Sequence, residues 1–228
     1  MKYSCNDKMS DMICNHYTLL QVMSRFGIPL GFGDATIKDV CQANGVDCGT
    51  FLAVANLMLQ PDEYVYDSHS HLSLPALMDY LKRSHHFFLD FRLPGIRGKL
   101  IRYVEQSGHR DVVPFILHFF DNYVEEVYTH MGYEDCQIFT YVEQLLEGQY
   151  TGAYSISDYA ERHEQNDEKL AELKNILIKY LPPVVDEYES GALLFDLFSC
   201  IEDLDAHGHV EDLIFVPAVR NLEKSVGR

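Results

Sequence analysis

The sequence predicts an all-α protein, an antiparallel four-helix bundle preceded by a small helical domain. Three observations predict this fold class. Four long amphipathic runs follow one another after residue 74, the connections between them are short, and the first 60 residues carry shorter helical patterns separated by glycines. Long helices joined by short connections pack as antiparallel neighbours around one core.

Length and composition agree with two folded parts. The chain has 228 residues, of which 47% are hydrophobic and 23% charged, the balance of an ordinary folded protein with a real core. This length exceeds that of the usual single domain. We expect the small domain at residues 1–62, a linker at 63–74 and the bundle at 75–228.

The N-terminal part predicts a compact helical module. Residues 11–60 show three short helical patterns, with turns at Gly27, Gly31–Gly33 and Gly45. The segment 61–71 has no helical period, and Ser73 is a suitable start for the next helix.

The bundle runs cover about 75–107, 111–147, 155–180 and 187–221. The expected ends are Gly108, Gly148 and the Pro182-Pro183 pair, and Ser155 or Ser157 can cap the third run. We expect kinks at or near Pro94 and Pro114, because proline cannot complete the helical hydrogen-bond ladder.

Charge and cysteine content exclude several classes of function. The net charge of −17 would repel phosphate backbones and anionic membranes, so nucleic acid and membrane surfaces are poor partners. No stretch approaches the ~20 apolar residues of a membrane span, and the first seven residues lack a signal-peptide core, so we expect a cytoplasmic protein. The six cysteines form no C-x-x-C pair and predict reduced thiols, mostly buried.

Two runs share the motif H-x-x-x-E-D, at His130–Asp135 and at His207–Asp212. Positions i and i+4 lie on one face of a helix, so each motif can direct an imidazole and a carboxylate, Glu134 or Glu211, to one point. Apolar residues follow both motifs and predict a hydrophobic setting for that face.

The other two runs also contain histidine, at His85-His86 and at His163. Adjacent helix positions point about 100° apart, so only one of His85 and His86 is expected to ligate. His85 continues the apolar stripe of its helix, but both remain candidates. Paired histidines with two carboxylates that can bridge suit two octahedral ions, and mixed imidazole–carboxylate ligation favours iron or manganese over zinc.

A single H-x-x-x-E on a helix is usually a surface pair or a hydrogen-bonded core histidine. Its repetition on alternate helices, with histidine on the remaining two, favours a metal site. His209 is turned away from His207 and is expected outside the ligand set. Loop or surface roles are expected for the five other histidines: His16, His69, His71, His109 and His118.

This pattern resembles the hemerythrin-like superfamily and, within it, the bacterial proteins for repair of iron centres, also called regulators of cell morphogenesis and nitric oxide signalling. The resemblance implies a non-haem di-iron centre, oxo- or hydroxo-bridged, held by four histidines and two bridging glutamates. By resemblance these ligands are His85 or His86, His130, Glu134, His163, His207 and Glu211. The match is carried by these residues and by the apolar segments that follow them.

The stretch from Val22 to Asp34 is similar to the small helical domain of the same family. The family has a Cys-Cys pair where this chain has Gly31-Phe32, and neither Cys41 nor Cys48 simply replaces that pair. A thiol-dependent role for this domain is therefore not carried over.

The resemblance implies handling of nitric oxide or dioxygen, or repair of damaged iron–sulfur proteins, under nitrosative and oxidative stress. An alternative is a non-enzymatic sensor or carrier that signals through the N-terminal domain, and a third is a metal-free interaction module. A homodimer is one option for the assembly. A ferritin-like oxidase is disfavoured by the lack of Glu-x-x-His pairs, and hydrolase or phosphate-loop motifs are missing from the sequence.

Overall fold

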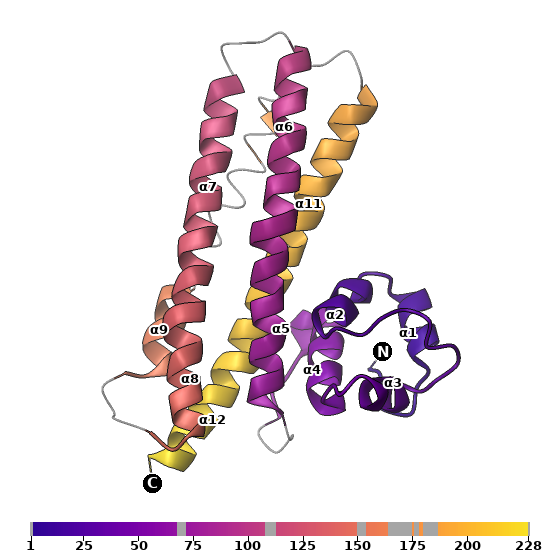
Figure 1. The fold of residues 1–228 in the computed structure, drawn as a ribbon, viewed down its shortest axis with the longest axis vertical. Helices are drawn as coiled ribbons and strands as arrows, with labels where there is room; N and C mark the ends of the chain where they lie inside the picture. The colour runs from indigo at the N-terminus through magenta and orange to yellow at the C-terminus, as the bar shows by residue number, and fades with distance from the viewer. Residues whose placement is uncertain are drawn as a thin grey trace. The chain divides into compact units, whose positions relative to one another are not determined.

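A computed structural model describes residues 2–67, 72–107, 113–149, 154–163 and 187–227, together with residues 175, 178 and 179. Within these ranges every regular element is helical, and the one extended pairing is an isolated bridge between Lys8 and Thr36. The predicted fold class, a helical bundle with an N-terminal helical region, is confirmed (Figure 1).

Four helices form the N-terminal region, where the sequence predicted three (Figure 1). They are α1 (Met9–Asn15), α2 (Leu19–Arg25), α3 (Ile37–Ala43) and α4 (Cys48–Leu59). The missed break lies between α1 and α2, where the Leu19 amide donates to the His16 carbonyl at 3.0 Å. This turn contains neither glycine nor proline, so the turn signals did not reveal it.

The glycine turns are confirmed where helices of this region end. Gly27 follows α2 with φ +71°, and the Ile28 amide donates to the Met23 carbonyl at 2.9 Å, a hydrogen bond that closes the helix end. Gly45 follows α3 with φ +67°. The next helix begins at a side-chain cap, since Asp47 accepts from the Thr50 amide at 2.8 Å.

The first long run begins where the sequence predicts. A short 3₁₀ turn, η1 (Pro61–Glu63), precedes it, and Ser73 accepts a hydrogen bond from the Ala76 amide at 3.3 Å. The run then comprises α5 (Leu74–Phe87), η2 (Phe88–Arg92) and α6 (Leu93–Ser107).

The second and fourth runs also follow the prediction closely. The second comprises α7 (Val113–Tyr133), η3 (Glu134–Ile138) and α8 (Phe139–Leu146), and Gly148 ends it with φ +78°. The fourth comprises α11 (Glu187–Val210), η4 (Glu211–Phe215) and α12 (Val216–Val226). Of the third run, the structure describes α9 (Ile156–His163) and, beyond it, residues 175, 178 and 179. Its expected end at Pro182-Pro183 lies outside the described residues, as does Gly108.

The segments η2, η3 and η4 are single π-helical turns inserted in otherwise α-helical runs. In η3 the Phe139 amide bonds to the Glu134 carbonyl, and in η4 the Val216 amide bonds to the Glu211 carbonyl, five residues back instead of four. Pro94 is the second residue after η2, and the kink expected there stays a prediction. Pro114 is the second residue of α7, where the missing N–H costs nothing.

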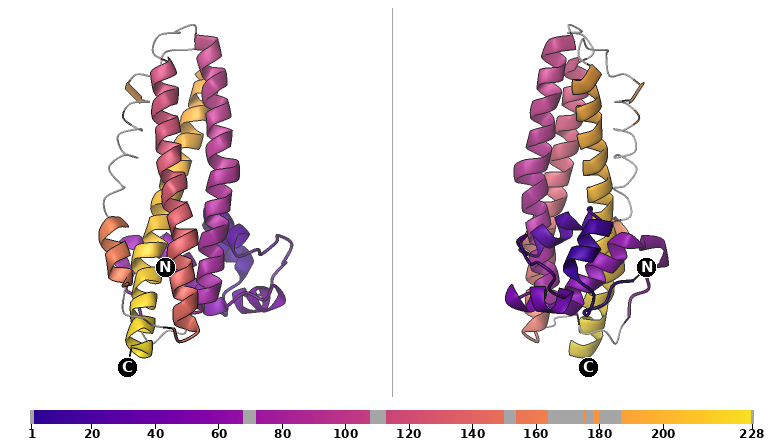
Figure 2. Two further views of the ribbon diagram at one scale, coloured as in Figure 1. Left: turned by 60° about the vertical axis from the view of Figure 1, so that its left-hand side comes forward. Right: turned by 90° about the vertical axis from the view of Figure 1, so that its right-hand side faces the viewer.

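One compact unit comprises residues 85–140 and 158–205. Within it α6, α7 and α11 run alongside one another (Figure 2). Arg97 of α6 donates two hydrogen bonds to the Asp121 carboxylate of α7, at 2.6 and 2.8 Å. Buried apolar residues of these helices form its core: Phe88, Leu93, Ile96, Leu100, Tyr103, Ile116, Phe120, Tyr123, Val127, Met131, Leu193, Leu197 and Cys200.

A second compact unit comprises residues 1–84, 141–157 and 206–228. Here the N-terminal helices pack on the first part of α5, and the ring centroids of Phe26 and Tyr80 lie 4.8 Å apart. The helices α8 and α12 are joined by the Tyr141 hydroxyl, which donates to the Glu223 carboxylate at 2.7 Å.

The cysteines are free thiols, but only Cys41 and Cys200 are buried, so the prediction that most would be buried is wrong. Both buried cysteines lie on the inner faces of helices, whereas Cys14 and Cys136 lie on outer faces that amphipathic periodicity would have identified. Burial, with a smaller contribution from Cys48, raises the pKa of Cys41 to about 12. Among the described helices, none has the length and apolar character needed to cross a bilayer.

Candidate metal centre

The two H-x-x-x-E-D motifs have the same local geometry. In the first, His130 Nε2 lies 3.1 Å from Glu134 Oε1, and in the second His207 Nε2 lies 3.2 Å from Glu211 Oε1. Each pair spans one helical turn, as the i, i+4 spacing predicts. Both glutamates are the first residue of a π-turn, so a widened helix segment begins at each carboxylate.

Four of the predicted side chains come together in a buried cluster. His85, Glu134, His207 and Glu211 each offer one ligand atom, and these atoms all lie within 4.8 Å of one another. The four residues are only 1–3% exposed. Two carboxylates buried this close together would be costly without a compensating cation, and two imidazole nitrogens beside them complete a donor set for a transition metal. The donor set therefore fits a bound metal ion.

The structure separates His85 from His86. His85 is buried, with Nε2 3.3 Å from Glu134 Oε2, and its ring stacks on Phe139 at 5.7 Å between centroids. The side chain of His86 is 66% exposed and contacts Asp90 of its own helix instead. Of the two candidates, the sequence-favoured His85 is therefore the one that lies in the cluster.

The two remaining histidine candidates are placed differently. His130 contacts Glu134, but its side chain is 25% exposed and it is not one of the four clustered residues. His163 is the last residue of α9, and its side chain lies outside the described part of the structure. Ligation by either histidine stays a prediction.

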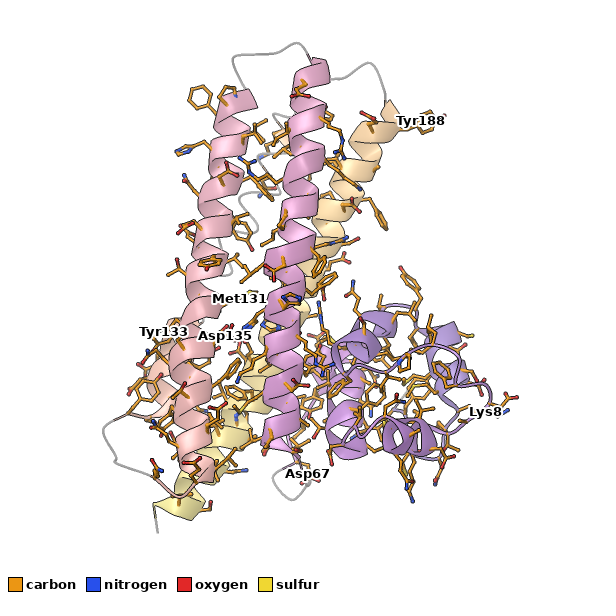
Figure 3. All side chains as sticks on the ribbon, in the orientation of Figure 1. Lys8, Asp67, Met131, Tyr133, Asp135 and Tyr188 are labelled. Atoms are coloured by element: carbon orange, nitrogen blue, oxygen red, sulfur yellow. The ribbon has the colours of Figure 1, made fainter. Side chains whose placement is uncertain are left out.

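Two residues that sequence reasoning did not single out contact the site. Asp135 Oδ1 lies 2.9 Å from His85 Nδ1, on the side of η3 that faces the helix carrying His85 (Figure 3). Metal-bound histidines commonly donate their other ring N–H to such a carboxylate, which fixes the tautomer and the ring orientation. The repeated Glu-Asp in both motifs was a signal that could have identified Asp135.

The second missed residue is Tyr159 of α9, which is buried and donates a hydrogen bond to Glu134 Oε1. No sequence signal marked Tyr159, because it belongs to no repeated motif. Its burial follows from its place on the inner face of α9 with Ile156.

Apolar residues follow each motif, as predicted, and are buried. Ile138 and Phe139 follow Glu134, and Ile214 and Phe215 follow Glu211, all at 1% exposure or less. They keep water from the carboxylates and strengthen electrostatic interactions within the cluster.

The other histidines are consistent with structural or surface positions where they are described. His16 packs edge-on against the Tyr3 ring, His118 is exposed beside Asn122, and His209 is half-buried on α11. His69, His71 and His109 lie outside the described residues.

Comparison with known proteins identifies the same part of the chain. A family model described as "Hemerythrin HHE cation binding domain" matches residues 75–219, well over half of the chain. The matched range contains every predicted ligand. No curated protein matches the chain.

Proposed function

Since this chain belongs to the hemerythrin family of cation-binding domains, we propose that its buried cluster is one part of a site for two iron ions. The observation that carries the proposal is the convergence of His85, Glu134, His207 and Glu211 within 4.8 Å. His130 and His163 are proposed as the further ligands. The two carboxylates each offer a second oxygen, so both can bridge two ions.

The protein residues supply position, charge and exclusion of water. Glu134 and Glu211 bring two negative charges that offset cationic charge in a buried setting. Asp135 holds His85 by Nδ1, so that Nε2 is directed toward Glu134. Phe139, stacked on His85, keeps this side of the site dry.

We propose that the site handles nitric oxide or dioxygen, or provides iron for repair of damaged iron–sulfur clusters. Bound iron would supply open coordination positions for a diatomic ligand and would exchange electrons with it. The support for this finer assignment is the histidine-rich donor set and the resemblance to the proteins for repair of iron centres.

The test uses the full chain loaded anaerobically with Fe(II). The proposal expects about two irons per chain, a spectral change on adding nitric oxide or dioxygen, and restored activity of an enzyme whose iron–sulfur cluster has been damaged. The matched control is the Glu134→Gln, Glu211→Gln double variant, which keeps side-chain shape and removes both charges. Loaded wild-type protein that neither reacts with the gases nor restores the enzyme would contradict the proposal.

A sensor role is the second candidate, and contacts of the N-terminal helices with α5 favour it. A Cβ at Gly27 would lie 2.5 Å from Arg83 Nη1, and the Ser73 amide donates to the Thr50 hydroxyl at 2.9 Å. Arg83 lies two residues before His85 in the same helix. A displacement of His85 when a gas binds at the metal would therefore alter the packing of the N-terminal helices on α5.

Hydrogen exchange of backbone amides distinguishes the sensor role from gas handling or iron repair without signalling. A sensor predicts that nitric oxide or dioxygen changes amide exchange in residues 22–28 of the iron-loaded protein. The change should be smaller in Gly27→Ala, whose Cβ would displace the Arg83 guanidinium, and kept in Gly33→Ala, which also has a left-handed φ but no atom within 4 Å. Identical exchange in residues 22–28 with and without the gases would rule out signalling through this contact.

A further inference from the structure

The two oxygens of Glu134 have different surroundings. Oε2 lies 3.3 Å from His85 Nε2. Oε1 lies 3.1 Å from His130 Nε2 and also accepts a hydrogen bond from the Tyr159 hydroxyl. Tyr159 is 3% exposed and comes from α9, a different run from Glu134. The carboxylate is therefore held from outside its own helix.

Metal binding would change which of these groups can donate to Oε1. An imidazole nitrogen that binds a metal uses its lone pair for the ion and carries no proton. His130, if it ligates through Nε2, can then no longer donate to Glu134 Oε1. Of the two groups at this oxygen, the Tyr159 hydroxyl is the one that is not itself a candidate ligand, so its hydrogen bond to Oε1 does not compete with metal binding.

We propose that Tyr159 is a positioning residue for the metal centre, whose phenol fixes the orientation of the Glu134 carboxylate when metal is bound. This inference rests on the proposed metal site. A glutamate has three rotatable bonds, whereas a buried tyrosine has few accessible rotamers, so the phenol restricts the carboxylate at little further entropic cost. The hydrogen bond also withdraws electron density from Oε1 and so tunes the ligand that the metal meets.

The chain offers a matched control for this role. Tyr141 is a partly buried tyrosine of α8 whose hydroxyl also donates to a carboxylate, that of Glu223, at 2.7 Å. Glu223 is not one of the four clustered residues. Tyr141→Phe therefore removes the same atom and the same kind of hydrogen bond at a carboxylate outside the cluster, one that also accepts from the Ile156 amide at the start of α9 at 2.8 Å.

The experiment measures Fe(II) affinity by competition with a chelator in wild-type protein, Tyr159→Phe and Tyr141→Phe. Loss of an outer hydrogen-bond partner typically weakens metal binding about 10- to 100-fold, and we expect this for Tyr159→Phe, with Tyr141→Phe within about twofold of wild type. The Mössbauer and optical spectra of the loaded centre should change in Tyr159→Phe alone. Wild-type affinity and spectra in Tyr159→Phe, or equal changes in both variants, would overturn the inference.

Two further measurements keep the result interpretable. Wild-type protein that binds no Fe(II) would reject the proposed metal site itself, whereas tight binding that is unchanged in Tyr159→Phe rejects only the role of Tyr159.

Circular dichroism of the metal-free variants checks folding. If Tyr159→Phe does not fold, ring-deuterated tyrosine at position 159 of the wild-type chain allows Raman detection of that phenol. A phenol that stays a hydrogen-bond donor after Fe(II) binding supports the inference, and one that loses this bond overturns it.

Discussion

The two H-x-x-x-E-D motifs are alike within their own helices and differ in what surrounds them. Both place Nε2 of the histidine 3.1–3.2 Å from the glutamate, and both begin a π-turn at that glutamate. However, the side chain of His130 is 25% exposed, whereas that of His207 is 4% exposed. The motif determines the local pair, but neighbouring runs determine how far that pair is shielded from water.

The largest expected effect comes from removing the charge of either motif glutamate. It tests whether the two motifs contribute equally to metal binding. Glu134→Gln and Glu211→Gln should each weaken Fe(II) binding by more than about 100-fold, since each removes a charged candidate ligand and not merely an outer partner. Chelator competition and metal analysis of the purified variants measure this. A variant that binds Fe(II) like wild type would show that its motif supplies no ligand.

Asp135 gives the first motif a contact to His85 and yields the next prediction. Asp135→Asn should weaken Fe(II) binding about 10- to 100-fold, because His85 loses the carboxylate that orients its ring. The matched control is Asp90→Asn, which removes the carboxylate beside the exposed His86. Equal effects of the two variants on affinity would contradict the assignment of His85 over His86.

The difference in shielding predicts unequal effects on the metal-free protein. His207→Ala removes a buried ring and should lower the free energy of unfolding by about 1–3 kcal/mol. His130→Ala removes a partly exposed ring and should cost less than about 1 kcal/mol. Urea denaturation with a chelator present provides both values. A larger loss for His130→Ala would mean that exposure does not rank the two histidines.

The smallest effect concerns the exposed ion pair between Arg97 of α6 and Asp121 of α7, the helix that leads into the first motif. Hydrogen bonds from Arg97 lower the pKa of Asp121 below its usual 3.8. The carboxylate therefore stabilises the fold above that pH, and this contribution is lost as the pH falls through the lowered pKa. Asp121→Asn should have a slightly lower urea midpoint than wild type at pH 7, and the two midpoints should converge below pH 3.8. A difference that is constant from pH 7 to pH 3 would exclude this linkage.

Much of the bundle could be predicted because its signals are local. The apolar period of 3.6 residues, Ser73 and Gly148 placed the ends of long helices, and the i, i+4 spacing placed His207 beside Glu211. The turn between α1 and α2 was missed because its residues carry no turn signal.

Features that depend on contacts between distant segments could not be predicted. Tyr159 reaches Glu134 across 25 positions of sequence, and Asp135 reaches His85 across 50. Neither contact follows from the period or propensity of a single helix. The π-turns escaped prediction because one extra residue in a turn barely changes the apolar pattern over a long run.

The π-turns also limit how this protein could change by insertion or deletion. Each turn holds one residue more than an α-helical turn, and two of them begin at a clustered glutamate. Deleting one residue from η3 or η4 would restore a regular α-helix but rotate everything beyond it by about 100° relative to the carboxylate. Either the carboxylate or the apolar face of α8 or α12 would then point the wrong way. The length of these segments should therefore be constrained as strictly as the identity of the carboxylates themselves.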